Sequence, residues 1–146
     1  MSGARAERTA VFVLRQLAVG FAVVGILFVA TPDGVVHTID DLGDQIGSFA
    51  HGPATHEKLW LALAFAYMTV ITGIAVVVSL DVVRYRPFLL VLAAGKAASS
   101  LAAGAYFVWS QDVFIYLLNF IVDGVLVGVA LGCWVLAGRA AARAPG

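Results

Sequence analysis

The run VFIYLLNFIVDGVLVGVALGCWVLA, residues 113–137, is apolar almost throughout. Crossing the ~30 Å hydrocarbon core of a bilayer takes about 20 helical residues, so the run is long enough to span a membrane. Two polar residues, Asn119 and Asp123, stand inside it. A spanning helix explains the length of the run, and the polar side chains then need partners.

The composition of the whole chain is typical of a membrane protein. Hydrophobic residues make up 62% of the 146 residues and charged residues 12%, against roughly 45–50% and about 25% in soluble domains. A soluble chain this short buries too little of its surface to hide so much apolar area from water. The lone Cys133 excludes an internal disulfide and a cysteine-based zinc site. We therefore expect a single membrane domain over residues 1–146.

Four apolar runs predict the fold. They are separated by helix-ending residues in TPDG, DVVRYRP and SQD, and GR follows the last run. The first run has no small-residue cleavage site after it, so we expect a retained anchor rather than a signal peptide. The predicted spans are residues 11–30, 59–80, 88–109 and 113–137. The predicted class is an all-α, integral membrane four-helix bundle.

The basic residues predict the orientation of the bundle. With four spans, both termini and the connection between the second and third spans lie on one side. That side carries Arg5, Arg8, Arg15, Arg84, Arg86, Arg139 and Arg143. The positive-inside rule places this side, and hence the N- and C-termini, in the cytoplasm.

The long connection between the first two spans predicts a short amphipathic helix at about residues 35–50. Apolar residues recur there at steps of three and four. They are Val35, Ile39, Leu42, Ile46 and Phe49. The polar residues expected to face away are Asp40, Asp41, Asp44 and Ser48. Such a helix would lie on the outer membrane surface or cap the bundle.

The same connection contains residue types that zinc or copper would use. The candidates are His37, Asp44, His51 and His56. Their spacing matches no metal motif, and the Gly and Pro of HGPATHE leave the ring positions undetermined. We therefore predict no metal site, but a solvated acidic face with helix-capping residues.

Asp123 lies near the middle of the fourth span, where an Asp costs roughly 2.5–3.5 kcal/mol by insertion scales. It shares one helix face with Tyr116 and Asn119, at steps of three and four, so these residues form a polar stripe. In the third span, Lys96 lies too deep for simple snorkelling. Because a short connection makes these two spans antiparallel neighbours, we expect Lys96 and Asp123 to pair.

Ser99 and Ser100 extend the polar surface of the third span, so a pocket is predicted around the pair, with Asn119 and Tyr116. The pair has two interpretations. It sets the helix register, with little net stabilisation, or it forms a ligand, ion or proton site, as intramembrane ionisable residues often do. The sequence leaves both open. No nucleophile–base pair occurs, so no catalytic residue is predicted.

Gly124, Gly128 and Gly132 form a GxxxGxxxG strip on the fourth span. Such a strip lets another helix approach closely. The other helix is either a neighbour in the same chain or the same helix of a second copy in a homodimer, and the sequence leaves both open.

The order of elements resembles the layout of DoxX-like small bacterial membrane proteins. The residues that carry the resemblance are Glu57, just before the second span, and the basic hairpin RYRP at residues 84–87. The resemblance implies a multi-pass protein of the bacterial inner membrane, in some cases an accessory to quinone-linked redox chemistry. No functional residue is carried over from it.

Three functions are consistent with these patterns. In the first, the pocket holds a lipophilic ligand or a partner subunit. In the second, Lys96 and Asp123 serve an ion- or proton-coupled transporter that acts as an oligomer. In the third, the chain is a quinone- or lipid-linked redox enzyme subunit, although no cofactor motif is present and none is predicted. The expected partners are the bilayer and a homodimer or larger membrane complex, not nucleic acid.

Overall fold

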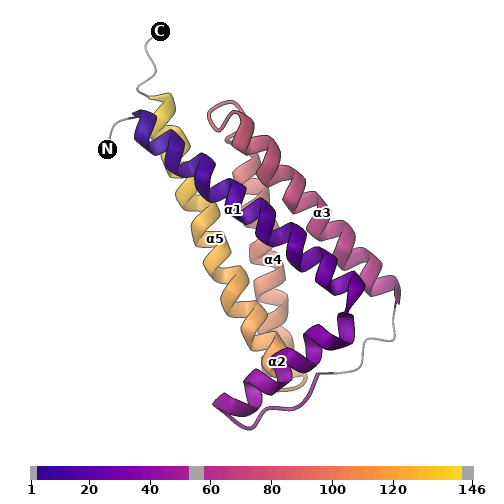
Figure 1. Cartoon of the computed structure of the whole chain (residues 1–146). Helices are drawn as coiled ribbons and strands as arrows, with labels where there is room; N and C mark the ends of the chain where they lie inside the picture. The colour runs from indigo at the N-terminus through magenta and orange to yellow at the C-terminus, as the bar shows by residue number, and fades with distance from the viewer. Residues whose placement is uncertain (1–2, 53–57, 143–146) are drawn as a thin grey trace.

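The computed structural model describes residues 3–52 and 58–142, which form five helices and no β-strand (Figure 1). The helices are α1 (Gly3–Ala30), α2 (Pro32–Ile46), α3 (Lys58–Leu80), α4 (Phe88–Trp109) and α5 (Phe114–Ala141). Four of them, α1, α3, α4 and α5, are long and apolar enough to cross a membrane. The predicted all-α class is confirmed, and α4 has the predicted bounds.

Helices α1 and α5 are longer than the apolar runs that predict them. Each has 28 residues, or about 42 Å at 1.5 Å per residue. Their added turns lie at the same end of the bundle, where Ala10 and Ala137 are fully buried in one cluster with Leu14 and Cys133. Small side chains allow the two backbones to approach closely. This packing supports helix beyond the limits that hydropathy alone predicts.

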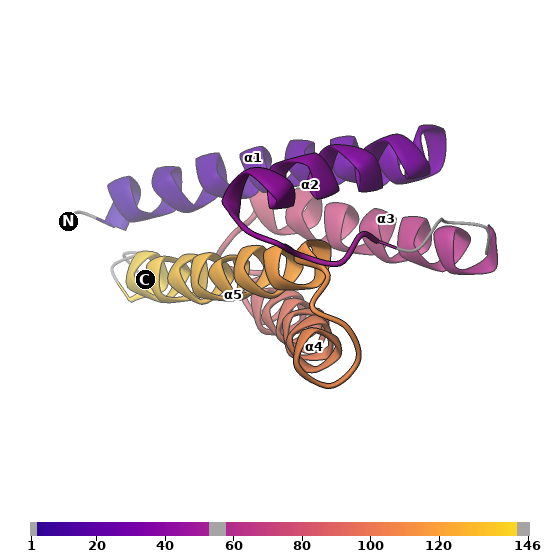
Figure 2. The same cartoon turned by 90° about the horizontal axis from the view of Figure 1, so that it is seen from below.

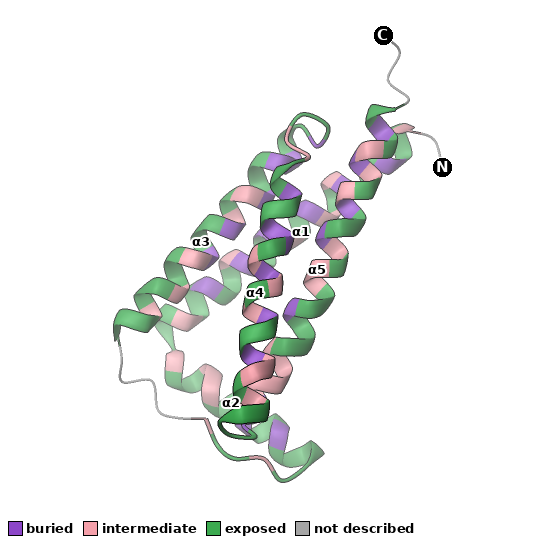
Figure 3. Ribbon diagram, turned by 180° about the vertical axis from the view of Figure 1, so that it is seen from behind, coloured by how far each residue is buried: buried purple, intermediate pink, exposed green. Residues whose placement is uncertain are grey.

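The four long helices form two antiparallel pairs, α1 with α3 and α4 with α5. One end of the bundle holds the start of α1 and the end of α5, and we call it the terminal end. Side chains from all four long helices share one core there. Towards the opposite end, the α2 end, the two pairs diverge, and α2 lies across them (Figures 1 and 3). Seen from below, α1 and α3 lie to one side of α4 and α5 (Figure 2). The bundle is therefore closed at the terminal end and spread at the α2 end.

A shorter helix, α2, follows the first long helix, but it starts and ends earlier than predicted. Pro32 stands in its first turn, where a missing N–H costs nothing. Its buried Gly43 lies against Phe114: a Cβ built on Gly43 would be only 2.8 Å from the Phe114 Cβ. The absence of a side chain at Gly43 thus allows α2 to lie against the start of α5.

The prediction that Asp40 faces away from the protein is wrong. Asp40 is 6% exposed, and its two carboxylate oxygens accept hydrogen bonds of 3.1 and 3.0 Å from the backbone N–H of Gly52. Leu42 and Ile46 of the predicted apolar stripe are 46% and 70% exposed, so they do not pack against the described protein. Periodicity misplaced Asp40 because its partner is a backbone group 12 residues away.

The segment after α2 attaches to the connection between α4 and α5. The ring of Phe49 lies 5.1 Å from that of Phe114, centroid to centroid. The backbone N–H of Ala50 donates to the carbonyl oxygen of Asp112 at 3.3 Å. Helix α2 and the segment after it are therefore attached to the α4–α5 hairpin.

At the terminal end, Arg86 fastens the α3–α4 connection to α5. Its Nε donates to the carbonyl oxygen of Trp134 at 2.9 Å, and its guanidinium carbon lies 3.8 Å from the centroid of the indole ring. Gly138 makes room for this contact, because a Cβ built there would lie 2.7 Å from an Arg86 Nη atom. Three residues from two segments thus close this end of the bundle.

We expect Gly138→Leu to displace Arg86 from Trp134 and to lower the stability of the protein by roughly 1–3 kcal/mol, the usual cost of overpacking. The midpoint of thermal unfolding in detergent measures the change. Gly73→Leu is the matched control, since a Cβ at Gly73 meets no described atom from another part of the chain within 4 Å. Equal losses in the two variants would contradict this role of Arg86.

Candidate functional site

A buried ion pair joins α4 to α5 near the middle of both helices. Lys96 Nζ lies 2.8 Å from Asp123 Oδ1, and the two side chains are 6% and 5% exposed. The antiparallel hairpin thus brings together the two charged residues that the sequence places inside the apolar runs. Because neither charge reaches water, each depends on the other for its stability.

Two further contacts between α4 and α5 lie between this ion pair and the α2 end. Asn119 Nδ2 donates to Ser99 Oγ at 3.3 Å, about one turn from the pair. Nearer the α2 end, the rings of Tyr106 and Tyr116 lie 5.8 Å apart between centroids. We call the three contacts the polar ladder: Lys96–Asp123, Ser99–Asn119 and Tyr106–Tyr116. The ladder runs from the middle of the hairpin to the α2 end, with one partner of each contact on each helix.

Ser100, which the sequence also places at the predicted pocket, contacts the backbone of α5. Its hydroxyl donates to the carbonyl oxygen of Phe120 at 2.8 Å, and the residue is 5% exposed. A Cβ built on Gly124 would lie 3.4 Å from Ser100 Oγ, in tight contact. The Ser100 hydroxyl is therefore engaged in packing α4 against α5.

Two aromatic residues beside Lys96 were not predicted. Its Nζ lies 4.9 Å from the ring centroid of Phe21 on α1 and 5.5 Å from that of Tyr67 on α3. Aromatic faces attract cations at such distances. All four long helices therefore contribute a side chain around the ion pair. Tyr67 was detectable as a lone tyrosine in an apolar run, whereas a phenylalanine such as Phe21 gives no signal.

The hydroxyl of Tyr67 is buried and has no hydrogen-bond partner within the described residues. A Cβ built on Gly95 would lie 3.4 Å from this oxygen. The tyrosine hydroxyl thus lies in ordinary van der Waals range of this position on α4, next to Lys96. A buried hydroxyl without a partner lowers stability by roughly 1–3 kcal/mol. Tyr67 thus places a polar group without a described hydrogen-bond partner next to the ion pair.

A cavity of about 340 Å³ adjoins the polar ladder. It is lined by Phe28 of α1, by Ser99, Ala102, Ala103 and Tyr106 of α4, and by Ile115, Tyr116 and Asn119 of α5. Two of the three ladder contacts thus contribute to its wall. None of the described residues that line it is charged. Apolar walls with a few convergent polar groups are typical of small-molecule sites.

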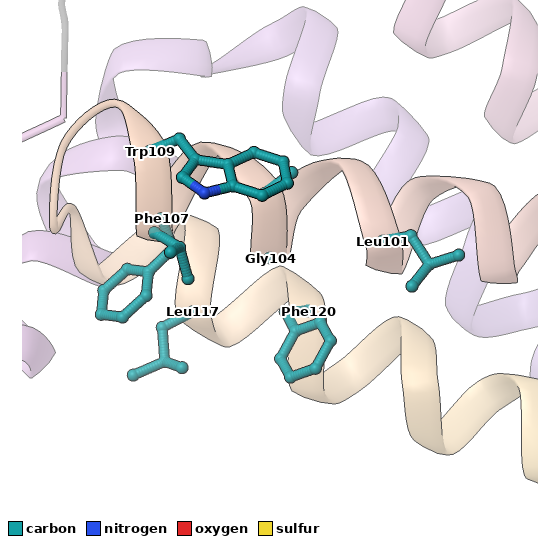
Figure 4. Close-up of a pocket in the computed structure, with 8 residues that line it drawn as sticks. Leu101, Gly104, Phe107, Trp109, Leu117 and Phe120 are labelled. Carbon is teal, nitrogen blue, oxygen red and sulfur yellow. The ribbon is translucent and has the colours of Figure 1, made fainter.

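A second hollow, of about 350 Å³, lies elsewhere on the same hairpin (Figure 4). It is lined by Leu101, Gly104, Ala105, Phe107, Val108, Trp109, Leu117 and Phe120, and we call it the apolar groove. Within it, a Cβ built on Gly104 would lie 2.8 Å from the ring of Phe120. The groove suits a hydrocarbon chain, but its walls have little with which to orient a polar headgroup.

The glycines of the predicted strip differ in their surroundings. Gly124 contacts Ser100, as described above. Gly128 and Gly132 are exposed, and a Cβ built on either meets no described atom within 4 Å. Of the three, only Gly124 takes part in packing inside the described protein.

Of the described residues considered for metal binding, two lie close together and the third lies apart. Asp44 and His51 form an exposed pair, with 3.4 Å between Oδ2 and Nε2, and His37 is exposed on α2. In the part of the chain that the structure describes, no group of three or more His, Cys, Asp or Glu side chains could hold a metal ion. His56 and Glu57 lie outside the described residues.

We expect Lys96→Met and Asp123→Asn to destabilise the protein by about 3–5 kcal/mol each, because each leaves the other charge buried alone. The double variant should be closer to the original protein than either single one. Thermal unfolding of the four proteins in one detergent measures the coupling. Losses that simply add would mean that the two side chains do not interact.

The chain matches no protein-family model, no curated protein and no solved structure. The function of the site therefore has to follow from the chemistry of its side chains.

Proposed function

We propose that this protein is an integral membrane protein that binds a lipophilic ligand in the cavity beside the polar ladder. Four helices have the length and composition to span a bilayer. Their surface is apolar as well: Leu80 and Val108 are 73% and 71% exposed. Lipid is the solvent that tolerates such a surface, since its chains are as apolar as these residues.

The cavity is the observation that carries the proposal. Asn119 uses one amide N–H toward Ser99. Its second N–H and its carbonyl oxygen have no partner within the described residues and are left for a ligand. Ala102, Ala103 and Phe28 supply apolar contact for a chain or ring. A ligand with one polar end and a hydrocarbon body fits this distribution of groups.

We further propose that α2 lies at the outer surface of the membrane and that both termini are cytoplasmic. The described arginines support this orientation, because those of α1, of the α3–α4 connection and of the last turn of α5 all lie in the half of the bundle at the terminal end. Trp60 and Trp109, 63% and 84% exposed, stand near the α2 end, as interfacial tryptophans would. The exposed Leu42 and Ile46 of α2 suit contact with the membrane surface. In this topology the cavity lies in the outer leaflet.

Placement in a bacterial inner membrane, and kinship with DoxX-like proteins, are parts of the same proposal. Their support is the layout: a long apolar helix, a shorter helix, then three long apolar helices. The ligand site itself does not depend on this kinship.

A photoreactive long-chain alcohol tests the ligand site. We expect it to label peptides of α4 and α5 in the purified protein, and Ala102→Phe to reduce the labelling roughly tenfold by filling the cavity, a change of about 1.4 kcal/mol. Ala105→Phe, in the apolar groove, is the matched control. If Ala105→Phe removes the label and Ala102→Phe does not, the ligand site is the groove and the proposal is wrong.

Self-association through α5 is a separate proposal, which concerns partners. Its support is that Gly128 and Gly132 are exposed and have no neighbour within the described protein, and close helix approach in lipid favours such positions. We expect Gly128→Leu to shift a homodimer to monomer, measured by the mass of the protein–detergent complex. An unchanged mass would exclude this face.

A further inference from the structure

We propose that the cavity accepts a neutral headgroup, and that the Lys96–Asp123 pair maintains this preference because each of its two charges neutralises the other. The cavity then selects an uncharged headgroup with a hydroxyl or carbonyl oxygen over an anionic or a cationic one. This inference rests on the proposed function and names the class of ligand, a neutral amphiphile.

The pair lies just beyond the cavity rather than in its wall. Ser99 and Asn119, which line the cavity, are three and four residues away from Lys96 and Asp123 along their helices. At 1.5 Å per residue, the axial separation is roughly 4.5–6 Å. The charges therefore act on a ligand through their field and not by direct contact.

The ammonium is also held in place by its surroundings. The rings of Phe21 and Tyr67 lie 4.9 and 5.5 Å from Lys96 Nζ, and the Asp123 carboxylate lies 2.8 Å from it. Neither ring is among the described residues that line the cavity. Lys96 is thus engaged by three groups and does not extend into the cavity as a counter-charge for an anion.

Two opposite charges 2.8 Å apart form a dipole, whose field falls off faster with distance than that of a single charge. At the cavity the two opposite charges offset each other in part, and the pair adds no net charge. A single charge at the same distance would act strongly, since screening among apolar helices is weak. The cavity of the intact protein is therefore close to neutral, and it depends on both partners for this property.

The groups that do line the cavity suit a neutral oxygen. The polar residues that line the cavity are Ser99, Asn119, Tyr106 and Tyr116, whose hydroxyl and amide groups donate and accept hydrogen bonds but carry no formal charge. An ionic headgroup would lose its hydration there without gaining an opposite charge, which is unfavourable. A hydroxyl or carbonyl gains partners instead.

Three lipids with the same acyl chains test the inference as competitors of the photoreactive long-chain alcohol in phosphatidylcholine nanodiscs. They are dioleoylglycerol, which is neutral, dioleoylphosphatidylglycerol, which is anionic, and dioleoyl-trimethylammonium-propane, which is cationic. We expect the neutral lipid to compete at about a tenfold lower concentration than either charged lipid, because a charged headgroup loses its hydration in the cavity without gaining an opposite charge. This ranking requires no variant and holds whether or not a substitution impairs folding.

Single substitutions should change the ranking in opposite directions. Asp123→Asn, at pH 5, leaves the Lys96 ammonium alone and should favour the anionic lipid about tenfold. Lys96→Met, at pH 9, leaves the Asp123 carboxylate alone and should favour the cationic lipid by a similar factor. The double variant removes both charges and should restore the preference for the neutral lipid, so it is the matched control.

The outcomes separate the two proposals. If the unaltered protein binds the photoreactive alcohol but ranks the three lipids equally, or prefers a charged one, the headgroup inference is overturned and the proposed function stands. Folded single variants that keep the ranking of the double variant also overturn it. If the unaltered protein binds neither the alcohol nor any of the three lipids, the proposed function itself fails.

Discussion

A charge placed among apolar helices is stable only beside an opposite charge, and this constraint governs the α4–α5 hairpin. Sliding one helix along the other by a single turn would separate Lys96 Nζ from Asp123 Oδ1, now 2.8 Å apart, and leave two charges buried alone. Every other register of α4 against α5 is therefore less stable. Once this register holds, Ser99 meets Asn119 and Tyr106 meets Tyr116 without further requirement. The polar ladder, and the wall of the cavity beside it, follow from one ionic contact.

The two ends of the bundle are held by different physical means, and this difference places the cavity. At the terminal end, small side chains such as Ala10 and Ala137 allow close packing, and Arg86 ties the α3–α4 connection to α5. At the α2 end, the contacts involve backbone groups and loop residues, such as the hydrogen bonds from Gly52 to Asp40. Close packing leaves few voids, whereas diverging helix pairs bridged by a short helix leave room for one. The cavity accordingly lies towards the α2 end.

The sequence predicts the long helices and the contact between two helices that a short connection makes antiparallel neighbours. The length of the apolar runs predicts the four long helices, and the depth of Lys96 and Asp123 in adjacent antiparallel runs predicts their contact. Prediction fails where the contact depends on the path of an irregular segment or on helices that are not consecutive along the chain. Asp40 looks solvated until Gly52 folds back onto it, and the added turns of α1 and α5 depend on packing between the two ends of the chain. The cavity depends on the divergence of helix pairs, which no local pattern encodes.

The sequence leaves two interpretations of the Lys96–Asp123 pair open, a structural one and a functional one. In this geometry the two interpretations are compatible. A pair of residues fixes the register of α4 against α5 only if the two are strongly coupled, because only strong coupling destabilises the wrong alignment. Because the two charges are paired, they also add no net charge next to the cavity, one turn away at Ser99 and Asn119. A hydrophobic register device would leave the cavity equally neutral, but it would not respond to the loss of one partner. The ionic device makes the headgroup preference depend on two residues that do not touch the ligand, so register and selectivity are two consequences of the same contact.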